Sequence, residues 1–135
     1  MIQRIQSIFL LLAALASLGT AAFRMELVQE TYAWLMPAVF GIHGLVALVA
    51  LVAIFLYKDR KKQLKTATML QYVAIVALLT AFGGLYLAGG LMEVPANLQA
   101  TGLLVLPVLA YVFVRIARGY VKKDIELVRS MDRLR

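Results

Sequence analysis

The sequence predicts an all-α membrane protein, a four-transmembrane-helix, up-down bundle with a C-terminal amphipathic cytoplasmic helix. Three observations support this fold class. Hydrophobic residues make up 63% of the chain and charged residues only 16%, whereas soluble domains average roughly 45–50% and 25%. Four long apolar segments, at about 5–23, 35–57, 69–91 and 98–114, contain no Asp, Glu, Lys or Arg. The basic residues gather on one predicted side of these segments.

Each apolar segment approaches or exceeds the roughly 20 residues that a bilayer-spanning helix needs. We expect helices over residues of about 5–23, 35–57, 69–91 and 98–117, followed by a tail over 118–135. The segments do not alternate polar and apolar positions as the strands of a transmembrane barrel do. Because the connections are short, neighbouring helices are predicted to run antiparallel within a single membrane domain, residues 1–135.

The first apolar segment has a competing interpretation as a cleavable signal peptide. Arg4 precedes the apolar stretch, and small residues follow it around 19–22. The leading charge is weak and the stretch is longer than the core of a typical signal peptide, so we expect the segment to be retained as a helix.

Charge placement predicts the orientation of the chain. Of the 14 Lys and Arg residues, all except Arg24 lie near the N-terminus, between the second and third segments, or after the fourth. Cytoplasmic loops retain basic residues, so both termini and the middle loop are predicted to be cytoplasmic. This sidedness also accounts for the net charge of +7 without nucleic-acid binding. The basic middle loop favours contact with anionic lipid headgroups.

Few residues inside the apolar segments carry chemistry. His43 is the only histidine, and it is interpreted either as a hydrogen-bonded residue of the bundle or as a titrating or ligand-binding group. Pro107 lies in the middle of the fourth segment, where the missing backbone donor predicts a kink that shapes the helix or opens a cavity. The main candidates for a buried polar network are Gln71, Tyr72, Thr80, Tyr86, Thr101 and Tyr111.

Missing residue types narrow the function classes further. The chain has no cysteine and no acidic residue within the apolar segments. Disulfides, thiol catalysis and iron–sulfur ligation are excluded, and a proton-coupled exporter is disfavoured because such proteins use intramembrane carboxylates. No nucleophile–base pair is recognisable. We expect no enzymatic activity, no metal site and no cofactor.

The C-terminal tail predicts a short amphipathic helix. Val121, Ile125, Val128 and Met131 share one helical face. This helix would be cytoplasmic, and it would either be separate or continue the fourth apolar segment. It would either lie on the membrane or cap the bundle. Arg4 is expected to meet one of three acidic groups there, namely Asp124, Glu126 or Asp132.

Both ends of the chain carry a recognisable pattern. The opening MIQRIQS followed by LLLA, and the ending KKDIELVRSMDRLR, resemble the small four-helix membrane proteins of Bacteroidetes known as domain of unknown function 4293. The resemblance implies a bacterial inner-membrane protein whose two cytoplasmic ends carry the signature. It implies no activity and no catalytic residues, because that family is uncharacterised.

The leading functional hypothesis is a non-enzymatic accessory or assembly subunit that binds a membrane-protein partner or lipid through its cytoplasmic ends. The candidate surface is Arg4, Lys58, Arg60, Lys61, Lys62, Lys122, Lys123, Asp124, Arg129, Asp132 and Arg133. The alternative is a small-molecule or lipid conduit formed by the bundle or a homo-oligomer, with a path near His43, Tyr86, Thr101 and Pro107. A weaker alternative is a cofactor-binding redox subunit.

Overall fold

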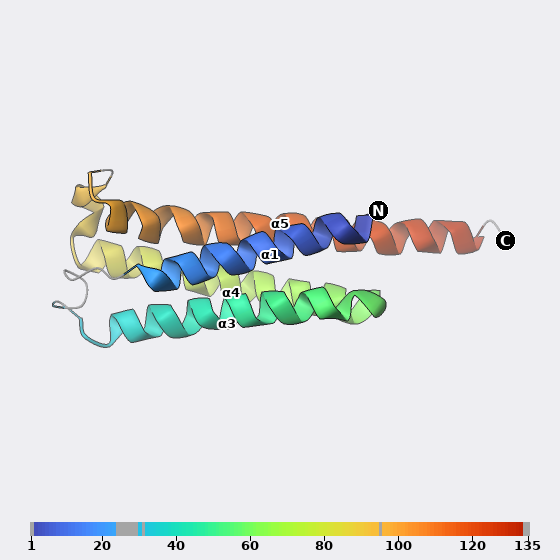
Figure 1. The fold of residues 1–135 in the computed structure, drawn as a ribbon, viewed down its shortest axis with the longest axis horizontal. Coiled ribbons are helices and arrows are strands. Elements are labelled where there is room, and N and C mark those ends of the chain that lie inside the picture. The colour runs from blue at the N-terminus through green and yellow to red at the C-terminus, as the bar shows by residue number, and fades with distance from the viewer. Residues whose placement is uncertain (1, 24–29, 31, 95, 134–135) are drawn as a thin grey trace.

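The structure is a computed structural model that describes residues 2–23, 30, 32–94 and 96–133. Its helices in chain order are α1 (Ile2–Ala22), α3 (Leu35–Phe55), η1 (Leu56–Lys58), α4 (Arg60–Leu87), η2 (Gly90–Glu93) and α5 (Leu98–Arg133). Successive long helices run in opposite directions and lie side by side (Figure 1). The predicted all-α, up-down bundle is confirmed.

Apolar side chains are distributed as in a protein surrounded by lipid. Each of the four long helices is long and apolar enough to cross a membrane. Large side chains such as Leu48 and Leu79, both 61% exposed, face outward. The interior is filled mainly by small residues from all four helices, including Ala13, Ala14, Ala47, Ala50, Ala53, Ala77 and Ala117. Small residues let helix backbones approach closely where no hydrophobic effect drives association. These features indicate a membrane protein.

Helix α4 begins nine residues earlier than the predicted start at 69, so most of the expected middle loop is helical. The side chain of Asp59 accepts a hydrogen bond from the backbone N–H of Lys62 (3.1 Å) and caps the new N-terminus. The basic residues that follow are good helix formers, which a search for apolar residues alone overlooks. At its other end α4 stops at Leu87, before Gly89 takes a φ of 73°.

Helix α5 continues without interruption through Pro107 and into the predicted tail as far as Arg133. In Figure 1 its last turns pass the N-terminal end of α1 and project beyond the other helices along the same axis. The described part of the tail therefore continues the fourth helix, which is one of the two arrangements that the sequence allowed, and it is not a separate helix folded over the bundle. Residues 119–133, called here the α5 extension, span about 22 Å at 1.5 Å per residue.

Candidate interaction site at the basic end of the bundle

One end of the bundle gathers the start of α1, the η1 turn between α3 and α4, and the beginning of the α5 extension (Figure 1). We call it the basic end. The predicted surface residues with described side chains lie in η1 and the first turn of α4 (Lys58, Arg60, Lys61 and Lys62) or along the α5 extension (Lys122, Lys123, Asp124, Arg129 and Asp132). The side chains of Arg4 and Arg133 lie outside the described part of the chain.

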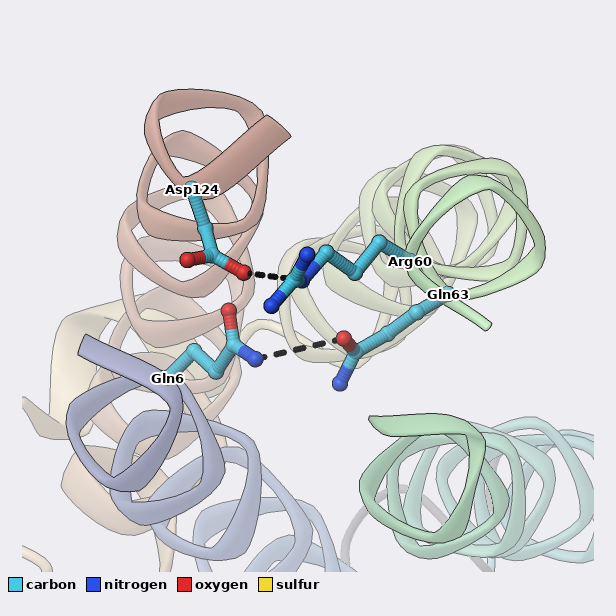
Figure 2. A network of polar contacts seen from close by, with 4 residues as sticks. All are labelled: Gln6, Arg60, Gln63 and Asp124. Carbon is cyan, nitrogen blue, oxygen red and sulfur yellow. Dashed lines mark hydrogen bonds and ion pairs between the residues drawn. The ribbon is translucent and has the colours of Figure 1, made fainter. Parts of the chain in front are cut away.

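A buried amide pair joins α1 to α4 at the basic end. Gln6 Nε2 donates to Gln63 Oε1 (3.2 Å), and Gln63 Nε2 donates to the backbone carbonyl of Ala53 in α3 (3.0 Å). Both glutamines are fully buried. Gln63 thus connects three helices, and Figure 2 shows its side chain meeting that of Gln6 between them.

Beside the amide pair, an ion pair joins α4 to the α5 extension. Arg60 Nε lies 2.7 Å from Asp124 Oδ2, and the aspartate side chain is only 13% exposed. Neither of these two atoms has a hydrogen-bond partner among the described residues, so the contact is an ion pair. Figure 2 shows the two side chains reaching toward each other just above the amides. Asp124 therefore meets Arg60 from α4, whereas the sequence suggested Arg4 as one candidate partner.

A third polar contact lies deeper between α4 and α5. Arg118 Nη1 donates to Gln71 Oε1 (2.8 Å), and Gln71 Nε2 lies 3.4 Å from the hydroxyl of Tyr111. Gln71 is only 8% exposed. The amide pair, the ion pair and the Arg118–Gln71 contact are together called the polar layer. Its residues are Gln6, Arg60, Gln63, Gln71, Arg118 and Asp124.

The first turn of the α5 extension packs on the bundle and the later turns leave it. The ring of Tyr120 stacks on Phe9 of α1, with centroids 5.8 Å apart and planes 10° from parallel. Val121 is buried, whereas Leu127 and Met131 are 48% and 60% exposed. The predicted apolar face therefore contacts the bundle at Val121 and no longer does so at Met131.

Electrostatics at the start of α4 centre on Asp59. Its pKa is lowered below the ordinary value of 3.8, chiefly because the backbone N–H of Lys62 donates to the carboxylate. The Lys62 ammonium adds an ion pair at 3.3 Å. This cap fixes the first turn of α4, which carries Arg60 toward Asp124.

Described residues at the basic end line several surface grooves, three of which lie along α4, along the extension and at the η1 turn. One of about 550 Å³ runs along α4 beside the extension and is lined by Lys61, Leu64, Lys65, Thr68, Met69, Tyr72 and Ile125. One of about 440 Å³ follows the extension and is lined by Tyr120, Lys123, Glu126, Leu127 and Ser130. One of about 390 Å³ lies at the η1 turn and is lined by Lys58, Asp59, Arg60, Lys61, Ile125 and Val128.

The predicted intramembrane residues do not assemble into one site. His43 is buried, and its Nδ1–H donates to the carbonyl of Val39 (2.9 Å). Tyr86 is 66% exposed and faces outward. The Thr101 hydroxyl donates to the backbone carbonyl of Asn97, just before α5, and Pro107 is buried within α5.

Gln63, Gln6 and Arg118 were not singled out from the sequence as bundle residues. The burial of Gln63 was not predicted because the apolar pattern placed the start of this helix at 69 instead of at Arg60. Once the helix begins at Arg60, Gln63, Ala67, Leu70 and Gln71 fall on one buried face. Gln71 and Tyr111 were predicted members of a buried network, and Gln71 contacts both the Tyr111 hydroxyl and Arg118.

Residues 24–134 match the family model described as Domain of unknown function (DUF4293), so the chain belongs to this family. The match covers the C-terminal pattern as far as residue 134 and begins after the N-terminal one. In comparisons with curated proteins and with solved structures, nothing matches this chain.

Proposed function

Proceeding from membership of a family of unknown function, we propose that the protein is a non-enzymatic accessory or assembly subunit of a bacterial inner membrane. In this proposal the basic end lies in the cytoplasm, because basic residues near membrane helices are retained there. The α5 extension then projects into the cytoplasm and binds a protein partner.

The exposed apolar face of the α5 extension is the observation that carries this proposal. Leu127 and Met131 are one helical turn apart, and both are about half exposed. Residues at this spacing are the usual anchors when a helix enters the groove of a partner. The neighbouring groove of about 440 Å³ places Lys123 and Glu126 beside Leu127, which supplies polar groups at the rim of such an interface.

Attachment to the bundle supports a docking role for the extension. Asp124 is paired with Arg60, and Tyr120 stacks on Phe9. A helix held in its bound orientation loses less conformational freedom on association than a disordered tail. The polar layer therefore positions the extension without contacting the partner itself.

Quantitative co-purification from native membranes tests the proposal. Leu127→Ser combined with Met131→Ser should lower recovery of a stoichiometric partner by about tenfold or more, since anchor residues dominate interface energies. The matched control is Leu48→Ser with Leu79→Ser, which makes the same chemical change on the outward face of the bundle. Equal recovery in all three proteins, or recovery of only a second copy of this chain, contradicts the proposal.

The conduit remains a second candidate function because of two buried polar atoms. Among the described residues, neither His43 Nε2 nor Ser17 Oγ has a hydrogen-bond partner. Such atoms usually meet a water molecule or a polar ligand. Solute flux in proteoliposomes that is abolished by Ser17→Leu would support a path through the bundle, and silent proteoliposomes would oppose it.

A further inference from the structure

The groove along the first turns of α4 combines two kinds of chemistry. Lys61 and Lys65 lie at its outer end, and Met69 and Tyr72 lie further along the helix, where they are 58% and 66% exposed. The axial distance from Lys61 to Tyr72 is about 16 Å at 1.5 Å per residue. The groove therefore changes from cationic to apolar along its length.

The two lysines are available to an external anion. Within the described part of the chain, neither Lys61 nor Lys65 forms an ion pair, whereas Asp59 is paired with Lys62 and Asp124 with Arg60. The carboxylates of Asp59 and Asp124 thus neutralise Lys62 and Arg60. Among the described residues, no acidic side chain neutralises Lys61 or Lys65.

We propose that this groove is a binding site for one anionic phospholipid, with the headgroup phosphate at Lys61 and Lys65 and an acyl chain along Met69 and Tyr72. The volume of about 550 Å³ accommodates a headgroup and the upper part of a chain, but not a whole lipid. The apolar part of the groove belongs to a helix that is apolar enough to span a membrane. A lipid reaches that surface from the bilayer, whereas a soluble acidic peptide or free phosphate gains nothing from it.

This site is independent of the partner-docking face. The groove uses the α4 side of the extension, through Ile125, whereas Leu127 lines a different groove. Loss of the lipid site would leave the apolar anchors of the extension unchanged. The two proposals can therefore fail separately.

Native mass spectrometry of the detergent-purified protein, exposed to equimolar phosphatidylglycerol and phosphatidylcholine, tests the site. The wild-type chain should retain a single phosphatidylglycerol in preference to phosphatidylcholine. Lys61→Gln combined with Lys65→Gln should weaken retention by about 30-fold, the combined effect of two lysines near an anionic headgroup. The control Lys122→Gln with Lys123→Gln removes the same charge from the extension and should retain the lipid.

A groove-filling variant distinguishes a built site from diffuse attraction. Thr68→Trp keeps every lysine but occupies the groove, and it should also reduce phosphatidylglycerol retention. Circular dichroism checks that each variant keeps its helix content. Equal retention of both lipids by the wild type, equal losses in the two lysine pairs, undiminished binding by Thr68→Trp, or displacement by inorganic phosphate would each overturn the proposal.

Discussion

The two ends of the bundle are held together by different interactions. At the basic end, side-chain amides, an ion pair and an arginine–glutamine bond join helices across the interface. At the opposite end, the cluster around Leu35, Val39, Leu85 and Leu103 is apolar. There the helices approach over glycines, where Gly84 faces the side chain of Leu35 and Gly102 faces the ring of Phe23.

The two kinds of contact control different features of the bundle, namely the distance between helices and the rotation of each helix about its axis. Close apolar packing fixes how near the helices lie, but it is tolerant of small rotations and shifts. Hydrogen bonds are directional, so the Gln6–Gln63 and Arg118–Gln71 contacts also fix the rotation of the helices that they join. The directional contacts lie where the α5 extension leaves the bundle, which is where orientation matters for docking.

The largest effect is expected from disruption of the buried amide pair. Gln63→Leu removes both contacts of Gln63 and leaves the Gln6 amide buried without its partner, which should cost about 3 kcal/mol of unfolding free energy. Gln6→Leu added to Gln63→Leu should recover most of this loss, because no polar side chain is then stranded. Denaturation in mixed micelles measures both values. Additive losses would show that the two amides act separately.

A smaller loss should follow overpacking at the opposite end. A Cβ on Gly102 would lie 2.8 Å from the ring of Phe23, so Gly102→Ala should cost about 2 kcal/mol. Gly83 is the matched control, since a Cβ there meets nothing within 4 Å. Gly83→Ala should leave stability unchanged or raise it by up to about 1 kcal/mol. The same micelle assay applies, and similar behaviour of the two variants would contradict the close approach.

The ion pair should contribute less to stability than to order in the extension. Asp124→Asn should cost about 1 kcal/mol, because Arg60 remains partly solvated. Hydrogen exchange within residues 122–133 should become faster as their attachment weakens. Glu126→Gln is the control, since its 3.8 Å contact with Lys122 is exposed on both sides. If hydrogen exchange in Asp124→Asn were unchanged, the ion pair would not be what attaches the extension to the bundle.

The smallest effect concerns acid stability at the start of α4. The folded-state pKa of Asp59 lies below its ordinary value of 3.8, so its stabilising contribution is complete above that value and is lost as the pH falls through the lowered pKa. Asn also caps helices but does not titrate in this range. A thermal melting series in acid should therefore be flatter for Asp59→Asn than for the wild type. Parallel curves would contradict this role of Asp59.

The fold was predictable because apolar length and charge placement are properties of whole segments. They identified the four helices, whereas the boundaries required local detail. The start of α4 depends on the Asp59 cap, and the length of α5 depends on good helix formers that follow the apolar segment. Neither signal enters a count of apolar residues.

The candidate site was predictable by region but not by pairing. Most of the predicted charged residues belong to the basic end, yet the partner of Asp124 is Arg60, more than sixty positions away in the sequence. Such a contact depends on how far each helix is rotated about its axis. Gln71 and Tyr111 were recognisable as polar residues in apolar helices, whereas Tyr86 has the same character and faces outward.

Photocrosslinking in native membranes tests the docking role of the α5 extension most directly. A photoreactive residue placed at Leu127 should yield one adduct of defined mass, whereas the same residue at outward-facing Leu79 should yield only lipid adducts. That adduct should weaken in Asp124→Asn, whose extension is less firmly attached. The contradicting result is a crosslinking pattern at position 127 that matches position 79, since the extension would then contact no protein partner.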